Sequence, residues 1–450
     1  MAIIGALPDQ KIESGKGDLL RILGIGFGVA VVVGGAVGQG IMRAPGLVAG
    51  ALPSAVWIMA AWLVGGLMCF VDAFATVELA ASVPRAGGPY AFVARAFGPF
   101  AGTIIGWSDW FNFVVSSGFM GVVFAEYVHR LGFIETVPIG VLAVSLIAVT
   151  WALNALGTRT SSMSQNVGSA LKAVALLGIV ALCFAAPHAA PVAPPAPHPA
   201  LTLAALAIGM RAVYNTFSGW NSCAYFCEEV HQPGRNIARS TFIGLAVVTG
   251  LYLLVNAALL HALTIPQIAA STLPVADAVG VLLGPRGAVV ATVFALISVA
   301  AITNLTVMCC TRIAYGMARN GILPSPLATV GKSGTPQVAL AVTVLGSAIC
   351  ASTGVYETLI AMGAVFAIMV SMGVDLAALW LRRTEPELDR PYKMPFFPLP
   401  PLLGLAINGA LLVALIHEDP LHSLTGMAIL AGVGASYLLA RRFRSQRAPA

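Results

Sequence analysis

Two short glycine-containing segments interrupt apolar stretches of this sequence and could hold a small zwitterion. The first is Gly38-Gln39-Gly40, with Pro45 close behind, and the second is Ser218-Gly219-Trp220. Where a helix is broken inside a membrane, one half ends in free carbonyl groups and the other begins with free N–H groups. Carbonyls attract an ammonium group and N–H groups attract a carboxylate, so the breaks predict a binding site for a small charged molecule.

Lys172 is the most informative single ionisable residue, because it lies within the apolar stretch 164–185. An ionisable group inside a membrane span is costly and is taken as functional by default. The alternative is a lysine whose ammonium group reaches the water at the membrane edge. Lys172 is about eight residues into the stretch, or roughly 12 Å by helical rise, which is deep for that alternative. We therefore predict a coupling role, which includes exchange of a proton.

Two arginines flank the breaks. Arg43 follows the first break by three residues, and Arg211 precedes the second by about two helical turns. They form either an external gate that attracts an anionic substrate group, or structural ion pairs with Asp109, Glu126 or the C-terminus of a helix. Transport of acidic and neutral substrates by an Arg211→Ala variant would separate these hypotheses.

Several aromatic and amide side chains lie near the same positions in the apolar stretches. Tyr214, Phe217 and Trp220 could close over a bound molecule. Asn112 and Asn221 could line the cavity, or they could form hydrogen bonds between helices, as amides in membrane spans often do. Both alternatives remain open for these residues.

Four acidic residues complete the set of candidates. Glu228 and Glu229, with Arg235 nearby, suggest a latch on the internal side of the membrane, and a solvated helix end is the alternative. Asp72 and Asp375 lie deep within apolar stretches, and the sequence assigns neither of them a partner.

The composition shows what kind of protein must position these residues. Hydrophobic residues make up 58% of the 450-residue chain and charged residues only 9%. Soluble domains carry roughly 25% charged residues, so a soluble protein of this size is excluded. A membrane span needs about 20 mainly apolar residues. Twelve stretches qualify, at residues 21–45, 53–80, 99–129, 135–156, 164–185, 202–230, 238–263, 286–316, 337–354, 357–381, 398–416 and 422–440.

The Pro/Ala-rich stretch Pro187–Pro199 divides these spans into two comparable sets of five, and each set opens with a broken span. Paired breaks in two halves are typical of transporter binding sites. The expected organisation comprises a cytoplasmic tail (1–20), a first five-helix repeat (21–186), an external loop (187–201), a second repeat (202–382), two further helices (383–440) and a basic cytoplasmic tail (441–450).

The basic residues predict the orientation. Nineteen of the 24 Lys and Arg residues fall in or beside segments that are cytoplasmic if the N-terminus is inside, and only Arg130 and Arg286 fall near external loops. This is the pattern of the positive-inside rule. No cleavable signal peptide is expected. We therefore expect a multi-pass protein of a bacterial inner membrane, with both termini in the cytoplasm.

Other classes of function find little support. The formal net charge is +6, and because most of the basic residues lie beside the expected cytoplasmic segments, this charge does not indicate nucleic-acid binding. The seven cysteines lie in or beside apolar spans, and Cys223 and Cys227 lack the further ligands that a metal site would need. No Ser/His/Asp set and no paired intramembrane carboxylates indicate an enzyme, and no cofactor, metal or accessory subunit is indicated.

Around the breaks the chain resembles the amino acid–polyamine–organocation superfamily of transporters, and in particular its L-type amino acid transporter branch. The resemblance covers roughly residues 20–440 and rests on five motifs in the same order. They are Val37-Gly38-Gln39-Gly40-Ile41, Glu78-Leu79-Ala80 with Pro84 to Tyr90, Ser218-Gly219-Trp220-Asn221 with Glu228-Glu229 and Arg235-Asn236, Arg312 to Pro324, and Arg390-Pro391-Tyr392.

The resemblance implies an all-α membrane protein with 12 transmembrane helices. Its LeuT-like fold would have five plus five inverted helices and two C-terminal helices, with helices 1 and 6 discontinuous. It also implies sodium-independent amino acid transport by alternating access, as an exchanger or a proton-coupled symporter. Transport of another small amine or organic anion on the same fold is the alternative, and few acidic residues near the breaks argue against a polycation.

By the same resemblance, the N–H groups of Gly38, Gln39 and Gly40 would bind the substrate α-carboxylate. Carbonyls near Val37 and Phe217 would face the α-ammonium group. Lys172 would stand where sodium binds in related transporters and would tie helices 1, 5 and 8 together. Gln39 replaces the family's small serine, so it could narrow the site or add a hydrogen bond.

Overall fold

The computed structural model describes most of the chain. The described residues are 19–132, 134–185, 187, 201–353 and 356–446. The predicted N-terminal tail 1–20 and the external loop 187–201 lie almost entirely outside the described residues, as does part of the tail 441–450.

Helices make up nearly all of the described structure, because a backbone inside a bilayer must satisfy its own hydrogen bonds. In the described part of the chain the extended backbone forms only an isolated bridge between Leu23 and Val230. The expected all-helical membrane class is confirmed. The elements are α1 (Ile25–Ala36), α2 (Gln39–Ala51), α3 (Ala55–Ser82), α4 (Pro89–Arg130), α5 (Ile139–Ala155), α6 (Thr158–Ala185), α7 (Leu203–Thr216), η1 (Trp220–Phe226), α8 (Pro233–Ala262), α9 (Ile265–Ala270), α10 (Pro274–Leu283), α11 (Pro285–Arg319), η2 (Ser325–Ala328), α12 (Gln337–Thr353), α13 (Tyr356–Thr384), α14 (Leu399–Glu418) and α15 (Pro420–Gln446).

Not all twelve predicted spans meet a length and composition test for crossing a membrane. Among the described residues eight helices do so, and α1 with α2 forms a bent pair that makes a ninth. The other three predicted spans correspond to the shorter helices α5 and α12 and to α7 followed by η1. The count of twelve therefore stays a prediction.

Two long helices, α4 and α11, pack against each other through the middle of the molecule. α4 begins ten residues before the predicted span 99–129, because its first turns continue into the span across a kink. At the kink Gly98 has a φ of 85°, and Pro99 cannot donate a helical hydrogen bond. The short helices α9 and α10 lie between the predicted spans 238–263 and 286–316, where the sequence predicted no span.

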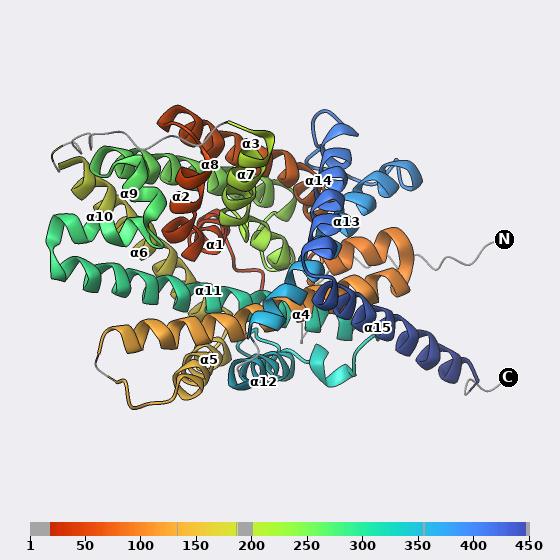
Figure 1. Cartoon of the computed structure of the whole chain (residues 1–450). Coiled ribbons are helices and arrows are strands. Elements are labelled where there is room, and N and C mark those ends of the chain that lie inside the picture. The colour runs from red at the N-terminus through yellow and green to blue at the C-terminus, as the bar shows by residue number, and fades with distance from the viewer. Residues whose placement is uncertain (1–18, 133, 186, 188–200, 354–355, 447–450) are drawn as a thin grey trace.

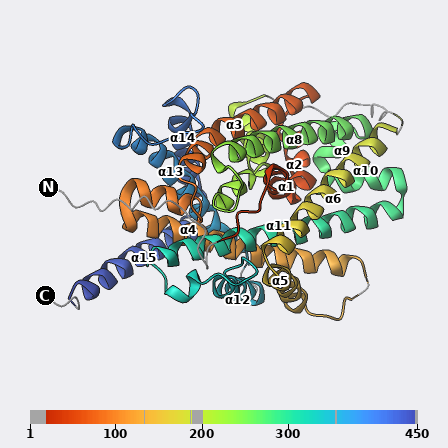
Figure 2. The same cartoon turned by 180° about the vertical axis from the view of Figure 1, so that it is seen from behind.

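The first helix lies at the centre of the bundle, as Figures 1 and 2 show. α1 packs against α6, α8, α11 and η1, whereas α2 packs against α7 and α9. We call the end of the bundle that carries Arg95, Arg319 and Arg382 the basic end. The other end, which carries α9 and α10, is the opposite end. The two broken helices therefore meet midway between these ends.

Candidate substrate site

The first predicted break is present in the structure. α1 ends at Ala36 and α2 begins at Gln39, while Val37 and Gly38 between them have non-helical backbone angles. The two halves are bent by 49°. The side chain of Gln39 lies outside the described part of the structure. The first N–H groups of α2 have no partner within their own helix, so they are available to an anionic group at the break.

Lys172 reaches this break from α6. Its side chain is fully buried, and its Nζ donates hydrogen bonds to the Gly34 carbonyl at 2.9 Å and the Val37 carbonyl at 3.0 Å. The hydroxyl of Ser298 on α11 donates to the same Val37 carbonyl at 3.4 Å. Hydrogen bonds that involve a charged donor are about twice as strong as neutral ones. Lys172 therefore joins α6 to the end of α1, and Ser298 joins α11 to the same carbonyl.

Tyr252 of α8 links the two broken helices. Its buried hydroxyl lies 2.8 Å from the Ala36 carbonyl at the end of α1 and 3.0 Å from the Thr216 carbonyl at the end of α7. Together with Lys172, it satisfies three of the carbonyls that the first break would otherwise leave free.

The second break lies directly against the first. α7 ends at Thr216, and Gly219 adopts a φ of 99°, which favours glycine. A Cβ atom at Gly219 would lie only 2.7 Å from the Gly35 carbonyl oxygen, so no side chain fits between the two backbones. The Ser222 hydroxyl donates to the Gly219 carbonyl at 2.7 Å and holds the turn into η1.

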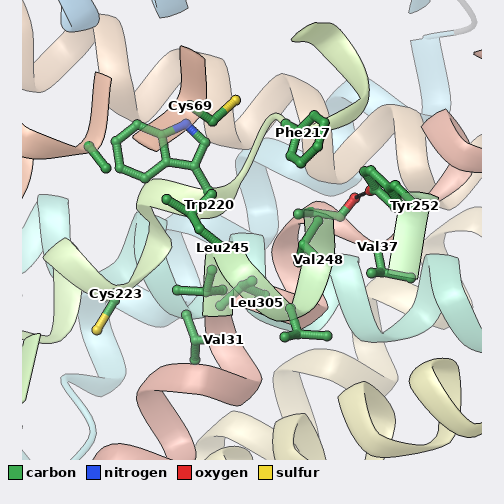
Figure 3. Close-up of a cluster of buried hydrophobic side chains, with 14 of the residues drawn as sticks. Val31, Val37, Cys69, Phe217, Trp220, Cys223, Leu245, Val248, Tyr252 and Leu305 are labelled. Carbon is green, nitrogen blue, oxygen red and sulfur yellow. Dashed lines mark hydrogen bonds between the residues drawn. The ribbon is translucent and has the colours of Figure 1, made fainter. Parts of the chain in front are cut away.

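The aromatic residues of the second break belong to the apolar core. Phe217 is fully buried, and its ring lies 4.8 Å from that of Tyr252 and 6.4 Å from that of Trp62 on α3. Trp220 is also buried, and Figure 3 shows it next to Cys69. Both rings therefore pack with the apolar core in this conformation.

The other predicted lining residues are spread around the break. Ile41 is fully buried, and Gly40 packs against Thr216. Ser218 is exposed and Asn221 is partly buried. A Cβ atom added to Gly363 on α13 would be in van der Waals contact with the amide oxygen of Asn112, so Asn112 lies beside that helix.

The three gating candidates have different surroundings. Arg211 forms an ion pair at 3.0 Å with Glu418, the last residue of α14, so its partner lies at the C-terminus of a helix and is neither Asp109 nor Glu126. Arg43 is exposed on α2, and its positive charge lies close enough to Tyr127 of α4 to interact electrostatically with the phenol group.

Tyr214, the third candidate, turns away from the break. Its hydroxyl donates to Asp72 of α3 at 3.1 Å. This contact faces α3 and α14 and does not contribute to the wall between α1 and α7.

A fully buried ion pair closes the basic end. Arg312 of α11 forms two hydrogen bonds of 2.9 Å to the carboxylate of Glu229, and their side chains are 1% and 0% exposed. The guanidinium group also lies 5.0 Å from the ring centroid of Phe226 and donates to the Met308 carbonyl. α11 is thereby locked to the end of η1.

Glu228 extends this closure. It pairs with Arg319 and accepts a hydrogen bond of 2.9 Å from the Ala86 backbone N–H. The sequence suggested Arg235 as the neighbour of Glu228 and Glu229. That pairing was wrong, because two arginines of α11, Arg312 and Arg319, form the ion pairs with these carboxylates. In addition, Leu23 forms backbone hydrogen bonds with the Glu229 carbonyl and the His231 N–H, so the chain before α1 is tied to the chain after η1.

The opposite end, in contrast to the basic end, contains a cavity. A cavity of about 460 Å³ lies between α2, α4, α10 and α11. Its polar lining includes Tyr127, Arg130 and Asp277, and its lining residues nearest to the first break are Met42 and Ala295. Met42 lies about one turn along α2 from Gln39, and Ala295 lies about one turn along α11 from Ser298, which contacts the Val37 carbonyl. The cavity therefore leads toward the site.

Sequence reasoning missed three residues that hold the site. Tyr252, Ser298 and Arg312 are polar groups inside apolar spans, which is the signal that singled out Lys172. Their partners are distant in the sequence, however, and the sequence alone could not supply them. Among the described residues no group of three or more His, Cys, Asp or Glu side chains could hold a metal ion.

Comparison with known proteins agrees with this architecture. The family model described as "Amino acid permease" matches residues 27–437. The mouse large neutral amino acids transporter small subunit 2 is 29% identical over 96% of this chain and 83% of its own length. The mouse b(0,+)-type amino acid transporter 1 is 27% identical over 90% of this chain and 84% of its own. The serine/threonine exchanger SteT of Bacillus subtilis is 24% identical over 92% of this chain and 95% of its own. The resemblance that the five motifs indicated is confirmed.

Proposed function

The chain belongs to the amino acid permease family, and on this premise we propose that it is a sodium-independent amino acid transporter working by alternating access. The family consists of transporters and not enzymes. The names of the relatives support amino acids as substrates, and that of the Bacillus protein supports exchange of small neutral ones.

The placement of Lys172 is the observation that carries this proposal. Its ammonium group lies among the oxygen atoms of Gly34, Val37 and Ser298 at the end of a broken helix. Hard metal cations are bound by clusters of such oxygen atoms. Because Lys172 already donates to the carbonyls of Gly34 and Val37, and Ser298 donates to the second of these, a sodium ion is not needed to hold α1, α6 and α11 together.

The substrate would lie between the two breaks. Its carboxylate would accept hydrogen bonds from the N–H groups at the start of α2, at Gly38, Gln39 and Gly40, where the helix dipole also favours a negative charge. The Val37 carbonyl is already engaged by Lys172. The carbonyl of Phe217 is therefore the better candidate for the substrate ammonium group.

Alternating access is supported by the contrast between the closed basic end and the cavity at the opposite end. By the positive-inside rule we assign the basic end to the cytoplasm, with both termini there, in a bacterial inner membrane. The structure then represents a conformation whose entrance faces outward.

Uptake into liposomes tests the proposal. Counterflow of a labelled neutral amino acid should proceed equally with sodium and with choline as the external cation. The Lys172→Ala variant should lose tenfold or more of this activity, because each charged hydrogen bond contributes about 1.5–3 kcal/mol. Lys332→Ala, which removes an exposed loop lysine, is the control and should leave uptake unchanged. Stimulation of the wild-type protein by sodium would refute the proposal.

Substrate identity can be found separately by thermal unfolding. A true ligand at 100 times its Kd raises the free energy of unfolding by about 2.7 kcal/mol. A panel of neutral, acidic and basic amino acids, together with simple amines, should show stabilisation by neutral amino acids. Stabilisation by amines alone would favour a different solute on the same fold.

A further inference from the structure

Two carboxyl groups within the bundle, the partly buried Asp72 and the buried Asp375, have no part in the site described above. Asp72 lies in the middle of α3 and Asp375 in α13, and the two are close enough for their charges to interact. Asp375 is 2% exposed, and its Oδ2 has no hydrogen-bond partner among the described residues. Two ionised carboxylates without a nearby cation are costly inside a membrane bundle, so the pair needs a positive charge from elsewhere.

A cavity of about 190 Å³ adjoins this pair. Asp72, Tyr214 and Asn408 supply its polar lining, and Gly404 of α14 forms part of its wall. The Asp375 carboxyl packs directly on Gly404, where a methyl group would overlap its oxygen atoms. The unpartnered oxygen is therefore aimed at the wall of the cavity that Asp72 lines.

The surrounding protein does not supply the missing charge. The ionisable groups that interact with the pair in the described part of the chain are Tyr214 from α7 and Cys69 from α3, and neither is a cation. Arg382 lies two turns further along α13, where it forms two hydrogen bonds to Glu78.

The lining of the cavity favours a proton over a metal ion. Hard cations such as Mg²⁺ and Ca²⁺ take about six or more oxygen ligands. Beyond its three polar side chains and Gly404, this cavity has an apolar lining of Val64, Leu67, Met68, Val71, Leu403 and Ile407.

We propose that Asp72 and Asp375 form a proton-binding pair whose occupancy sets the position of α7. In the unprotonated pair, the Tyr214 hydroxyl donates to Asp72 and holds α7 against α3. A proton that enters through the cavity binds a carboxylate oxygen of one of the two residues. The pair loses one negative charge, and Asp72 no longer depends on Tyr214.

The position of α7 matters because it is the first half of the second broken helix. Thr216 at its end packs against Gly40 and accepts a hydrogen bond from Tyr252, so a shift of α7 alters the substrate site. The expected consequence is that amino acid transport depends on protons, and this consequence rests on the proposed transport function. The proton-binding step itself can be tested without transport.

Infrared difference spectroscopy of the purified protein tests the binding step. The wild-type protein should show a protonated-carboxyl band that titrates, and both Asp72→Asn and Asp375→Asn should remove it. Asp389→Asn, which changes an exposed aspartate between α13 and α14, is the matched control and should keep the band. Persistence of the whole band in both Asp72→Asn and Asp375→Asn would overturn the proposal.

Transport measurements test the consequence. Wild-type uptake should rise several-fold under an inward proton gradient and not under an inward sodium gradient. Asp375→Asn should retain counterflow at equal pH but lose the stimulation by protons, and Tyr214→Phe should lose the stimulation while keeping the infrared band. If Asp375→Asn keeps both counterflow and proton stimulation, the inference is wrong. If wild-type counterflow fails, the transport function is wrong, and the infrared band still decides whether the pair binds a proton.

Discussion

The two ends of the bundle are closed by different kinds of contact. At the basic end, Arg312 and Glu229 form an ion pair whose side chains are 1% and 0% exposed. At the opposite end, the pair between Arg211 and Glu418 is half exposed, at 52% and 54%, and this end also has the cavity between α2, α4, α10 and α11. Removing one partner of a buried pair leaves an unpaired charge in the interior, whereas an exposed pair contributes little.

This difference shows where the molecule can open at low cost. The basic end is held by groups that must stay paired, so it opens only if the pair separates into water or finds new partners. The opposite end is held mainly by close backbone contacts, such as that of Gly46 on α2 with the Ser271 carbonyl, where a Cβ atom would lie 2.5 Å away. Such contacts can separate without leaving a charge unpaired.

The largest effect is expected from Glu229→Gln. This change leaves Arg312 charged and without its carboxylate, which should lower the free energy of unfolding by about 3–5 kcal/mol. It should also loosen the basic end, so that Cys227, which is fully buried beside Glu229, becomes reactive to maleimide.

The matched control for that change is the double variant Glu229→Met with Arg312→Met. It removes both charges, and stability should return to within about 1–2 kcal/mol of the wild type, since an apolar pair of similar size often replaces a buried ion pair without loss. Equal destabilisation of the single and double variants would show that the charge is not what closes this end.

A smaller effect is expected from Gly46→Ala at the opposite end. The added methyl group would press on the Ser271 carbonyl, and overpacking of this kind costs about 1–3 kcal/mol. It should hold the opposite end open and slow counterflow several-fold. Gly50→Ala, one turn further along α2, meets only an ordinary contact at 3.9 Å and should behave like the wild type.

The smallest effect is expected from Arg211→Ala. Exposed ion pairs contribute about 0–1 kcal/mol, so thermal stability should change little. Because Arg211 pairs with Glu418 and points away from the break, the ratio of acidic to neutral amino acid transport should not change either. A changed ratio would show that Arg211 influences which substrates pass the opposite end, as the hypothesis of an external gate requires.

The sequence by itself determined the helical membrane class, the position of both breaks and the presence of Lys172 deep inside an apolar helix. These follow from local properties: runs of apolar residues long enough to span a bilayer, glycines that interrupt them, and one ammonium group too deep to reach water. The first ten residues of α4 and the short helices α9 and α10 were missed, because turns outside the long apolar stretches carry a weaker local signal.

Only the tertiary structure decided which groups meet. Tyr252 reaches the Ala36 carbonyl across 216 residues of sequence, and Arg312 reaches Glu229 across 83. Arg235 was reasonable from spacing as a neighbour of Glu229, yet helix packing placed Arg312 of α11 against that carboxylate. The physical reason is that spacing along a chain sets which face of a helix a side chain occupies, whereas the neighbour of that face is set by how all the helices pack together.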